Sequence, residues 1–284
     1  MGFTLNSSAD GTILRPTVVP PPSEAHKYSR GHAMVWSGPA LHTGASRLSA
    51  QGSLAVGAGL VTIVGERAAL AEHAAHVTAI MLREANPAFD FVDDHVSAFA
   101  IGPGAGAGSQ QAVLKVLGCG VPTVLDADAL TTFEKHPELL FNAVASTDVM
   151  TPHLGEFQRI FPDIKLEGRQ KAVIRAAERA QCVVLLKGAE TCIAAPDGSY
   201  LVNRHASPWL ATAGSGDVLT GLICGLLAQG VPSFDAAAIA TWLHGDIGVR
   251  AGPGLTADSM IGYIPLVLRG CLHDASGHVS GSRT

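Results

Sequence analysis

Short apolar segments alternate along this chain with longer stretches rich in Ala, Leu and Glu, and this alternation restricts its fold more than any other feature. Each short segment is apolar throughout, as in strands that are buried on both faces of a parallel sheet. The longer stretches suit the helical crossovers that parallel strands require. We therefore expect an α/β fold with a mostly parallel central sheet and helices on both faces. The predicted strands are 33–36, 60–64, 98–101, 123–126, 148–150 and 182–187, and the predicted helices are 66–82, 109–118, 168–180, 215–229, 234–250 and 257–269.

The chain shows no internal repeat and no linker that would divide its 284 residues into two folding units. Residues 1–25 are rich in Pro and Ser towards their end, and we expect them to form a flexible N-terminal arm. Residues 191–202 contain two strand-like runs around a Pro-Asp-Gly turn, which predicts a hairpin. We expect one domain over residues 26–271, followed by a C-terminal tail over 272–284.

Composition narrows the possible partners. Charged residues make up only 15% of the chain, against a usual share of about 25%, which favours a large core and a further buried surface in a homo-oligomer. The formal net charge of −5 argues against nucleic acid, because binding to phosphate backbones requires clustered Lys and Arg. No apolar stretch reaches the roughly 18 residues of a membrane span. The first ten residues lack a secretory leader, and the five Cys are unpatterned, so we expect a cytoplasmic protein with reduced thiols.

Several common catalytic motifs are absent. The sequence contains no GxxxxGK[ST] phosphate loop, no GxSxG elbow and no HExxH zinc motif. The run "GPGAGAG" fails the dinucleotide pattern GxGxxG, because Ala107 stands where the third glycine is required. A P-loop enzyme, an α/β-hydrolase and a zinc enzyme are therefore disfavoured.

The stretch "AGSGDVLTG" presents a carboxylate where a helix begins. Gly214, Ser215, Gly216 and Asp217 directly precede an apolar run that reads as a buried helix. One interpretation is structural, since an acid in the first turn gains roughly 0.3–1 kcal/mol from the helix dipole. The other is catalytic: the glycine amides would hold a phosphoryl group, and Asp217 would act as general base, an effect of about 10²–10⁴-fold. We favour the second, because a cap does not require flanking glycines.

Three motifs in the order "TPHLGE", "KGAET" and "AGSGDVLTG" resemble the ribokinase-like superfamily, and more narrowly the ADP- or ATP-dependent NAD(P)H-hydrate dehydratases. The resemblance runs from Lys27 to about Leu268 and includes "HKYSRGHAMVWSGPALHTGAS", "AIGPGAG" and "VLDADAL". It implies a single-domain ribokinase-like sandwich. Departures from the family pattern are modest, with Ser215 in place of Thr and Leu154 where Pro is common.

The resemblance implies a lyase of metabolite repair that dehydrates the 6S epimer of NADH or NADPH hydrate. The ring hydroxyl would be phosphorylated by ADP, or by ATP, and phosphate would then be eliminated. It further implies Mg²⁺, a homotetramer and a separate epimerase protein, since relatives with a fused epimerase are longer. Two alternatives remain: a small-molecule alcohol kinase of the same fold, of the hydroxyethylthiazole type, and a non-catalytic nucleotide-binding protein.

The resemblance also implies the site residues. Asp217 matches the catalytic, substrate-contacting aspartate, and Glu156 could hold magnesium through water. The substrate-binding matches are Ala45, Gly104 and His153, and the nucleotide-binding matches are Lys187, Gly188, Ala189, Glu190, Thr191, Gly214, Ser215 and Gly216.

Some of these positions also have a structural explanation. Lys187 could be a solvated strand end, His153 a surface or core histidine, and Glu156 an acid of a first helical turn. Asp126 and Asp128 could cap a helix or face the cleft.

Overall fold

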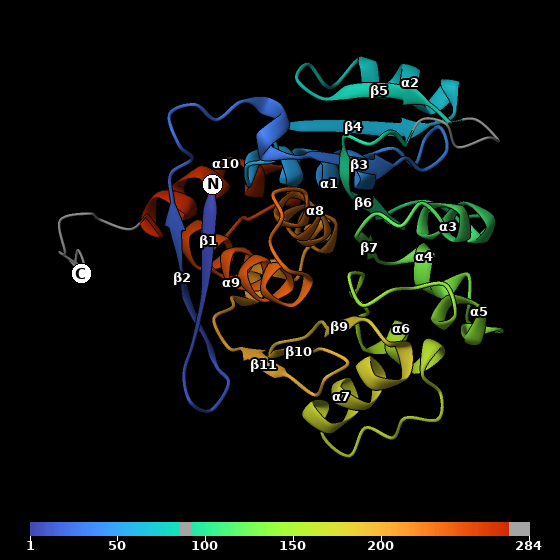
Figure 1. The fold of residues 1–284 in the computed structure, drawn as a ribbon, viewed down its shortest axis with the longest axis vertical. Coiled ribbons are helices and arrows are strands. Elements are labelled where there is room, and N and C mark those ends of the chain that lie inside the picture. The colour runs from blue at the N-terminus through green and yellow to red at the C-terminus, as the bar shows by residue number, and fades with distance from the viewer. Residues whose placement is uncertain (86–91, 273–284) are drawn as a thin grey trace.

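The computed structural model describes residues 1–85 and 92–272 (Figure 1). Its centre is a nine-stranded sheet with the order β11-β10-β9-β8-β7-β6-β3-β4-β5. Strands β3 to β9 pair in parallel, and β10 and β11 add the predicted hairpin in antiparallel pairing. The strands are β3 (His32–Trp36), β4 (Leu60–Gly65), β5 (Met81–Glu84), β6 (Val96–Ile101), β7 (Thr123–Leu125), β8 (Val149–Met150), β9 (Val183–Leu186), β10 (Thr191–Ala194) and β11 (Tyr200–Asn203).

Helices cover both faces of the sheet, as the alternation predicted, and Figure 1 shows the two layers on opposite sides. One face packs on α1 (Gly44–Ala55), α8 (Ser215–Ala228), α9 (Ser233–Ala251) and α10 (Ala257–Gly270). The other packs on α3 (Gln110–Leu117), α4 (Asp128–Thr131), α5 (Pro137–Phe141), α6 (Leu154–Ile160) and α7 (Arg169–Ala180). Successive residues of a strand point to opposite faces, so Phe99 enters one core and its neighbours Ala98 and Ala100 the other.

Helices α1 and α8 run in parallel along a seam of small residues. Ser49 Oγ donates to the carbonyl of Asp217 (2.8 Å), and Ser53 Oγ donates to that of Gly221 (2.8 Å). A side chain at Gly221 would collide with the backbone of Ser49, so glycine is required for this close approach. The seam places the N-termini of both helices side by side.

The N-terminal segment differs from the flexible arm that we expected. It forms an antiparallel hairpin of β1 (Gly2–Ser7) and β2 (Ile13–Val19), in which Ile13 and Val18 are buried in the core. The stretch 66–82 was expected as one helix, but α2 (Arg67–Ala74) ends early and the edge strand β5 follows. Strand β5 is short and ends in the charged pair Arg83 and Glu84, as edge strands often do, so it lacks the apolar run that marks the buried strands. Apart from Leu272, the expected tail lies outside the described residues.

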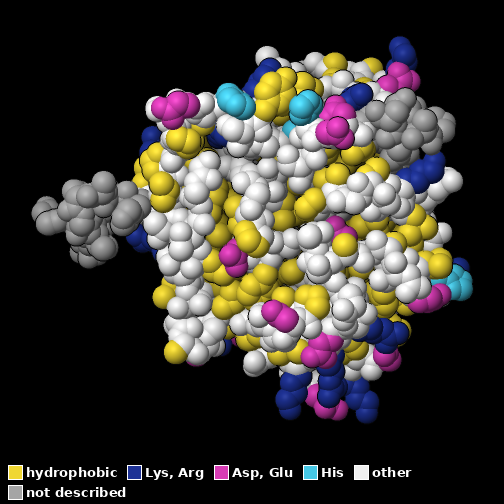
Figure 2. Space-filling view, viewed as in Figure 1, with side chains coloured by type: hydrophobic (Ala, Val, Ile, Leu, Met, Phe, Trp, Pro, Cys, Tyr) yellow, Lys and Arg dark blue, Asp and Glu magenta, His cyan; other side chains and the backbone are white. Residues whose placement is uncertain are grey.

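Two short 3₁₀ helices, η1 (Lys27–Arg30) and η2 (Pro208–Leu210), complete the described elements. Within residues 1–85 and 92–272, no helix combines the length and hydropathy needed to cross a bilayer. On the face in Figure 2, charged side chains gather around α7, whereas the centre of that face is largely uncharged.

Candidate active site

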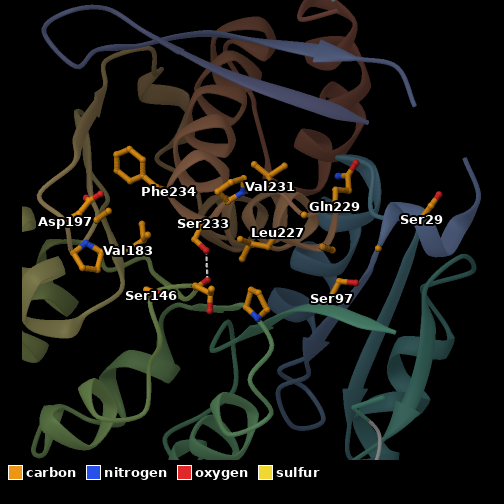
Figure 3. Close-up of a pocket in the computed structure, with 18 of the residues that line it drawn as sticks. Ser29, Ser97, Ser146, Val183, Asp197, Leu227, Gln229, Val231, Ser233 and Phe234 are labelled. Atoms are coloured by element: carbon orange, nitrogen blue, oxygen red, sulfur yellow. Dashed lines mark hydrogen bonds between the residues drawn. The ribbon is translucent and has the colours of Figure 1, made fainter. Parts of the chain in front are cut away.

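Among the hollows formed by the described residues, two lie at opposite ends of the sheet. The one at the amino ends of the strands, about 840 Å³, is drawn in Figure 3 and lies between the end of α8 and the start of α9. Its described lining holds Asp197 but no Lys, Arg or His, so it has little to offer an anionic ligand. The other, about 810 Å³, opens at the carboxyl ends and includes Lys187, His153 and the start of α8. Ligands of open parallel sheets bind at that end, which makes this second hollow the candidate active site.

The N-terminus of α8 begins at a glycine that packs too closely to carry a side chain. Gly214 precedes the helix with φ +87°, and a Cβ there would lie only 2.7 Å from Ala257 Cβ. The first N–H groups of a helix have no intrahelical acceptor and carry the positive end of its dipole. Helix α1 runs alongside in the same direction, with Ser49 opposite Asp217, so both helices begin at this end of the sheet.

A buried ammonium group joins three elements at this end of the sheet. Lys187, just after β9, places its Nζ 2.6 Å from Asp126 Oδ1 and 3.9 Å from Glu156 Oε2. Asp126 Oδ2 accepts a hydrogen bond from Thr220 Oγ1 on α8 (2.8 Å). The Asp126 side chain is only 2% exposed, so the ion pair is not that of a solvated lysine.

Charge placement shifts the proton affinity of Asp217. Burial, reinforced by the negative charge of Asp126 and opposed by Lys187, raises the pKa of Asp217 to about 6. Burial by itself would lower the pKa of Lys187, but the neighbouring carboxylates outweigh it and raise that pKa above its usual value. Lys187 therefore stays cationic, while Asp217 is a base with a pKa of about 6, near neutral pH.

The backbone turn after β7 is strained. Ala127 has φ +49°, although it carries a side chain, and its N–H donates to Asp126 Oδ1 (2.9 Å). Such conformations cost free energy and cluster at functional sites. The turn separates the two acids of "LDADAL": Asp126 faces Lys187, whereas Asp128 accepts from Gly106 N–H (2.9 Å). Only Asp126 thus joins the charged network.

His153 and Glu156 form a reciprocal cap at the start of α6. His153 Nδ1 accepts from the N–H groups of Gly155 and Glu156, and His153 N–H donates to Glu156 Oε2 (2.8 Å). Since Nδ1 accepts, the proton lies on Nε2, which is 3.3 Å from Glu156 Oε1. His153 is half exposed at the hollow, and Glu156 is buried beneath it.

No three His, Cys, Asp or Glu side chains converge as a metal site within the part of the chain that the structure describes. Mg²⁺ nevertheless often keeps several waters and binds through one or two carboxylates and substrate phosphates. Glu156, whose Oε2 lies 3.9 Å from Lys187 Nζ, offers carboxylate oxygens that fit this water-mediated mode.

His244 was missed by the sequence analysis. It lies on α9, lines the hollow, and places Nε2 2.9 Å from Ser215 Oγ and 3.0 Å from Ser215 O. Burial lowers the pKa of His244 to about 4, so its ring is neutral and holds the first turn of α8 by hydrogen bonding. These residues are 29 positions apart on different helices, and no sequence signal pairs them.

Ala45 and Gly104 contact each other and do not line the hollow. A Cβ at Gly104 would lie 3.3 Å from Ala45 Cβ and 3.0 Å from the carbonyl oxygen of His42. Gly38 abuts the carbonyl of Gly104 so closely that a side chain there would collide with it. The two predicted substrate residues thus share a small-residue wall outside the hollow.

The remaining predicted residues divide between the lining of the hollow and its surroundings. Gly214 and Asp217 flank the lining at the start of α8. Glu190 is directed to the surface, where its carboxylate pairs with Arg204 (3.1 Å), so only its backbone could meet a nucleotide. The predicted residues in the lining are His153, Lys187, Gly188, Ala189, Thr191, Ser215 and Gly216.

The chain matches one family model and is similar in sequence to known proteins. A family model described as NAD(P)H-hydrate dehydratase matches residues 33–266. A bifunctional NAD(P)H-hydrate repair enzyme from Synechocystis sp. is 40% identical over 242 residues, 81% of this chain and 46% of that protein. The chain thus spans about half the length of such relatives.

Solved structures share the fold. An ADP/ATP-dependent NAD(P)H-hydrate dehydratase from Bacillus subtilis, co-crystallised with ATP and Mg²⁺, has a TM-score of 0.75 at 28% identity, covering 89% of this chain and 94% of that one. A ribokinase-like superfamily protein from Enterococcus faecalis has a TM-score of 0.80 at 24% identity, covering 90% and 92%.

Proposed function

The chain belongs to the NAD(P)H-hydrate dehydratase family, and from this premise we propose that it converts the 6S hydrate of NADH or NADPH back to the reduced cofactor, using ADP or ATP. The observation that carries the proposal is the position of Asp217. Its carboxylate, with a pKa of about 6, lies in the first turn of α8, and the neighbouring Gly216 borders Lys187 in the lining of the hollow.

The nucleotide would bind in the hollow with its terminal phosphate at the start of α8. A Cβ on Gly216 would lie 3.6 Å from Lys187 Nζ, so the bare glycine leaves room for phosphate oxygens beside the ammonium group. Lys187 and the helix N–H groups then stabilise the negative charge of the phosphoryl group in transfer. Ser215, held by His244, keeps this turn in place.

In the first step, the ring hydroxyl of the hydrate attacks the terminal phosphorus. The bond from phosphorus to the bridging oxygen breaks, and Asp217 accepts the hydroxyl proton. Ala45, Gly104 and His153 are proposed to hold the substrate in line for this attack, which is mainly a positioning effect.

In the second step, the lone pair of the ring nitrogen expels phosphate from C6, and loss of a proton from C5 restores the dihydropyridine. Hydroxide is a poor leaving group at neutral pH, whereas phosphate is a good one. Phosphorylation of the hydroxyl therefore makes the elimination possible. Mg²⁺, held by Glu156 through water, would supply neutralisation of phosphate charge.

We also propose that the protein is a homotetramer in the cytoplasm. Epimerisation of the hydrate is then carried out by a different domain or protein. Light scattering would test the tetramer. Fractionation of cells would test the location.

The direct test supplies the purified hydrate with ADP and, in parallel, with ATP. Reduced nicotinamide absorbance should return, with one phosphate and one AMP (or ADP) released for each molecule repaired. Asp217→Asn serves as the inactive control. The proposal is wrong if neither nucleotide supports repair. If the protein then phosphorylates hydroxyethylthiazole, it is an alcohol kinase.

A further inference from the structure

The loop from Ser37 to Thr43, between β3 and α1, carries an unusual residue at its tip. Leu41 has φ +71°, a left-handed conformation that favours glycine, and its side chain is 89% exposed. Single exposed leucines are ordinary, and strained backbone can be tolerated. Here both occur at one residue, and neither is compensated by packing of that side chain within the described protein.

The last turn of α2 holds this strained conformation from one side. Both carboxylate oxygens of Glu72 accept the N–H of Leu41, at 2.9 and 3.0 Å, and Oε2 also accepts Thr43 Oγ1 at 3.2 Å. A hydrogen bond to an ionised acceptor is stronger than one to a neutral acceptor, so the carboxylate can maintain a strained turn.

The next residue of α2 holds the other end of the loop. Ser37 Oγ donates to the carbonyl of Gly38 (2.8 Å) and lies 2.9 Å from Nε2 of the fully buried His73. Because the hydroxyl proton is used, the imidazole Nε2–H donates to Ser37. Two successive residues therefore fix both ends of a loop that presents one leucine to solvent.

The loop borders the substrate side of the candidate site rather than the nucleotide hollow. Its Gly38 and the carbonyl of His42 pack against Gly104, and it leads directly into Ala45. None of residues 37–43 lines the nucleotide hollow. Since α1 and α8 begin side by side, the loop lies at the end of the molecule where Asp217 is found.

We infer that Leu41 is a substrate-contacting residue, whose side chain packs on the apolar face of the hydrated nicotinamide ring, and that Glu72 is its positioning residue. The inference rests on the proposed function and deepens it, because it assigns recognition of the ring to an apolar contact. Ordering the backbone of the loop in advance lowers the entropy lost on binding. The left-handed turn is maintained because it directs the leucine away from its own core.

The test compares Leu41→Ala and Leu41→Gly with Leu139→Ala, an exposed leucine on α5. Both Leu41 variants should raise KM for the hydrate about five- to tenfold and leave KM for ADP unchanged. The Kd of the product NADH, measured by calorimetry, should rise in parallel. Leu41→Gly should leave the melting temperature near that of the wild type, because relief of the strain offsets the greater freedom of glycine in the unfolded chain. Leu139→Ala should change none of the binding constants.

Glu72 is tested by its own pair of variants. Glu72→Ala should raise KM for the hydrate with little change in kcat, and Glu72→Gln, which keeps one acceptor, should recover part of the loss. The inference is overturned if the wild type repairs the hydrate while both Leu41 variants keep KM and Kd within twofold. It is equally overturned if their KM changes accompany a fall in molecular mass by light scattering, which would make Leu41 a subunit contact. A wild type that repairs no hydrate removes the proposed function itself.

Discussion

Lys187 donates a hydrogen bond of 2.6 Å to Asp126, and this ion pair joins the ends of β9 and β7 across the intervening β8. The two residues are 61 positions apart in the chain. Their pairing leaves Asp217 close to one negative and one positive charge, with the negative neighbour and burial together raising its pKa.

Asp217→Asn should remove turnover and stabilise the protein. We expect kcat to fall by about 10²–10⁴-fold, because no base accepts the hydroxyl proton, while the Kd of ADP stays near its wild-type value. Folding raises the pKa of Asp217 from 3.8 to about 6. The free energy of unfolding of the wild type therefore falls as the pH rises from about 4 through 6. The variant should therefore gain up to about 3 kcal/mol in urea unfolding at pH 8 and almost nothing at pH 4. Surviving turnover would exclude Asp217 as the base.

The pH profile of kcat/KM should have an acid limb near pH 6. Below that pH, Asp217 is protonated and activity should fall about tenfold for each unit. Asp126→Asn removes the like charge and should move the limb to lower pH, measured from initial rates of hydrate repair. A limb that stays in place would show that Asp126 does not act on the titrating group.

Lys187→Met should be strongly destabilising, because it leaves the buried carboxylates of Asp126 and Glu156 without a cation. We expect a loss of about 3 kcal/mol in the free energy of unfolding, measured with urea. The double variant Lys187→Met/Asp126→Asn should recover part of it, since one uncompensated charge is removed. Additive losses in the double variant would contradict the ion pair as the cause.

Alanine at Gly216 should weaken nucleotide binding, whereas alanine at Gly214 should destabilise the fold. At Gly216 the new Cβ meets Lys187 Nζ at 3.6 Å, an ordinary contact, so stability should hold while KM for the nucleotide rises. At Gly214 the Cβ would lie 2.8 Å from Leu48 Cδ1 in a backbone with φ +87°, so the free energy of unfolding should fall by about 2 kcal/mol. Thermal melts and nucleotide titrations of both variants check the pair. Equal melting temperatures would refute this account.

Ala127→Gly should cost little stability. Relief of a strained turn, about 1–2 kcal/mol, offsets the greater freedom of glycine in the unfolded chain. Ala71→Gly, at an exposed position of α2, should lose about 1 kcal/mol. Despite its stability, Ala127→Gly should have a lower kcat, because Asp126 is less firmly placed. A loss equal to that of Ala71→Gly would mean that the turn is not strained.

Most of the central sheet could be predicted from the chain itself. Apolar runs such as residues 98–101 have a local cause, since every residue of a strand covered on both faces must be apolar. Asp217 could be singled out for a similar reason: its flanking glycines and the apolar run are neighbours in the sequence. Elements whose stability comes from distant contacts were missed, including β5, the β1–β2 hairpin and α1, whose Ser and Gly residues pack on α8.

The sequence by itself thus determined the class of fold and the residue expected to act as base. Only the tertiary structure decided which groups surround that base. Asp126, Lys187 and Thr220 meet because strand order places β7 and β9 near the start of α8, and His244 reaches Ser215 from another helix. Periodicity and turn chemistry act over a few neighbouring residues, whereas a pKa depends on charges brought within several ångströms by packing.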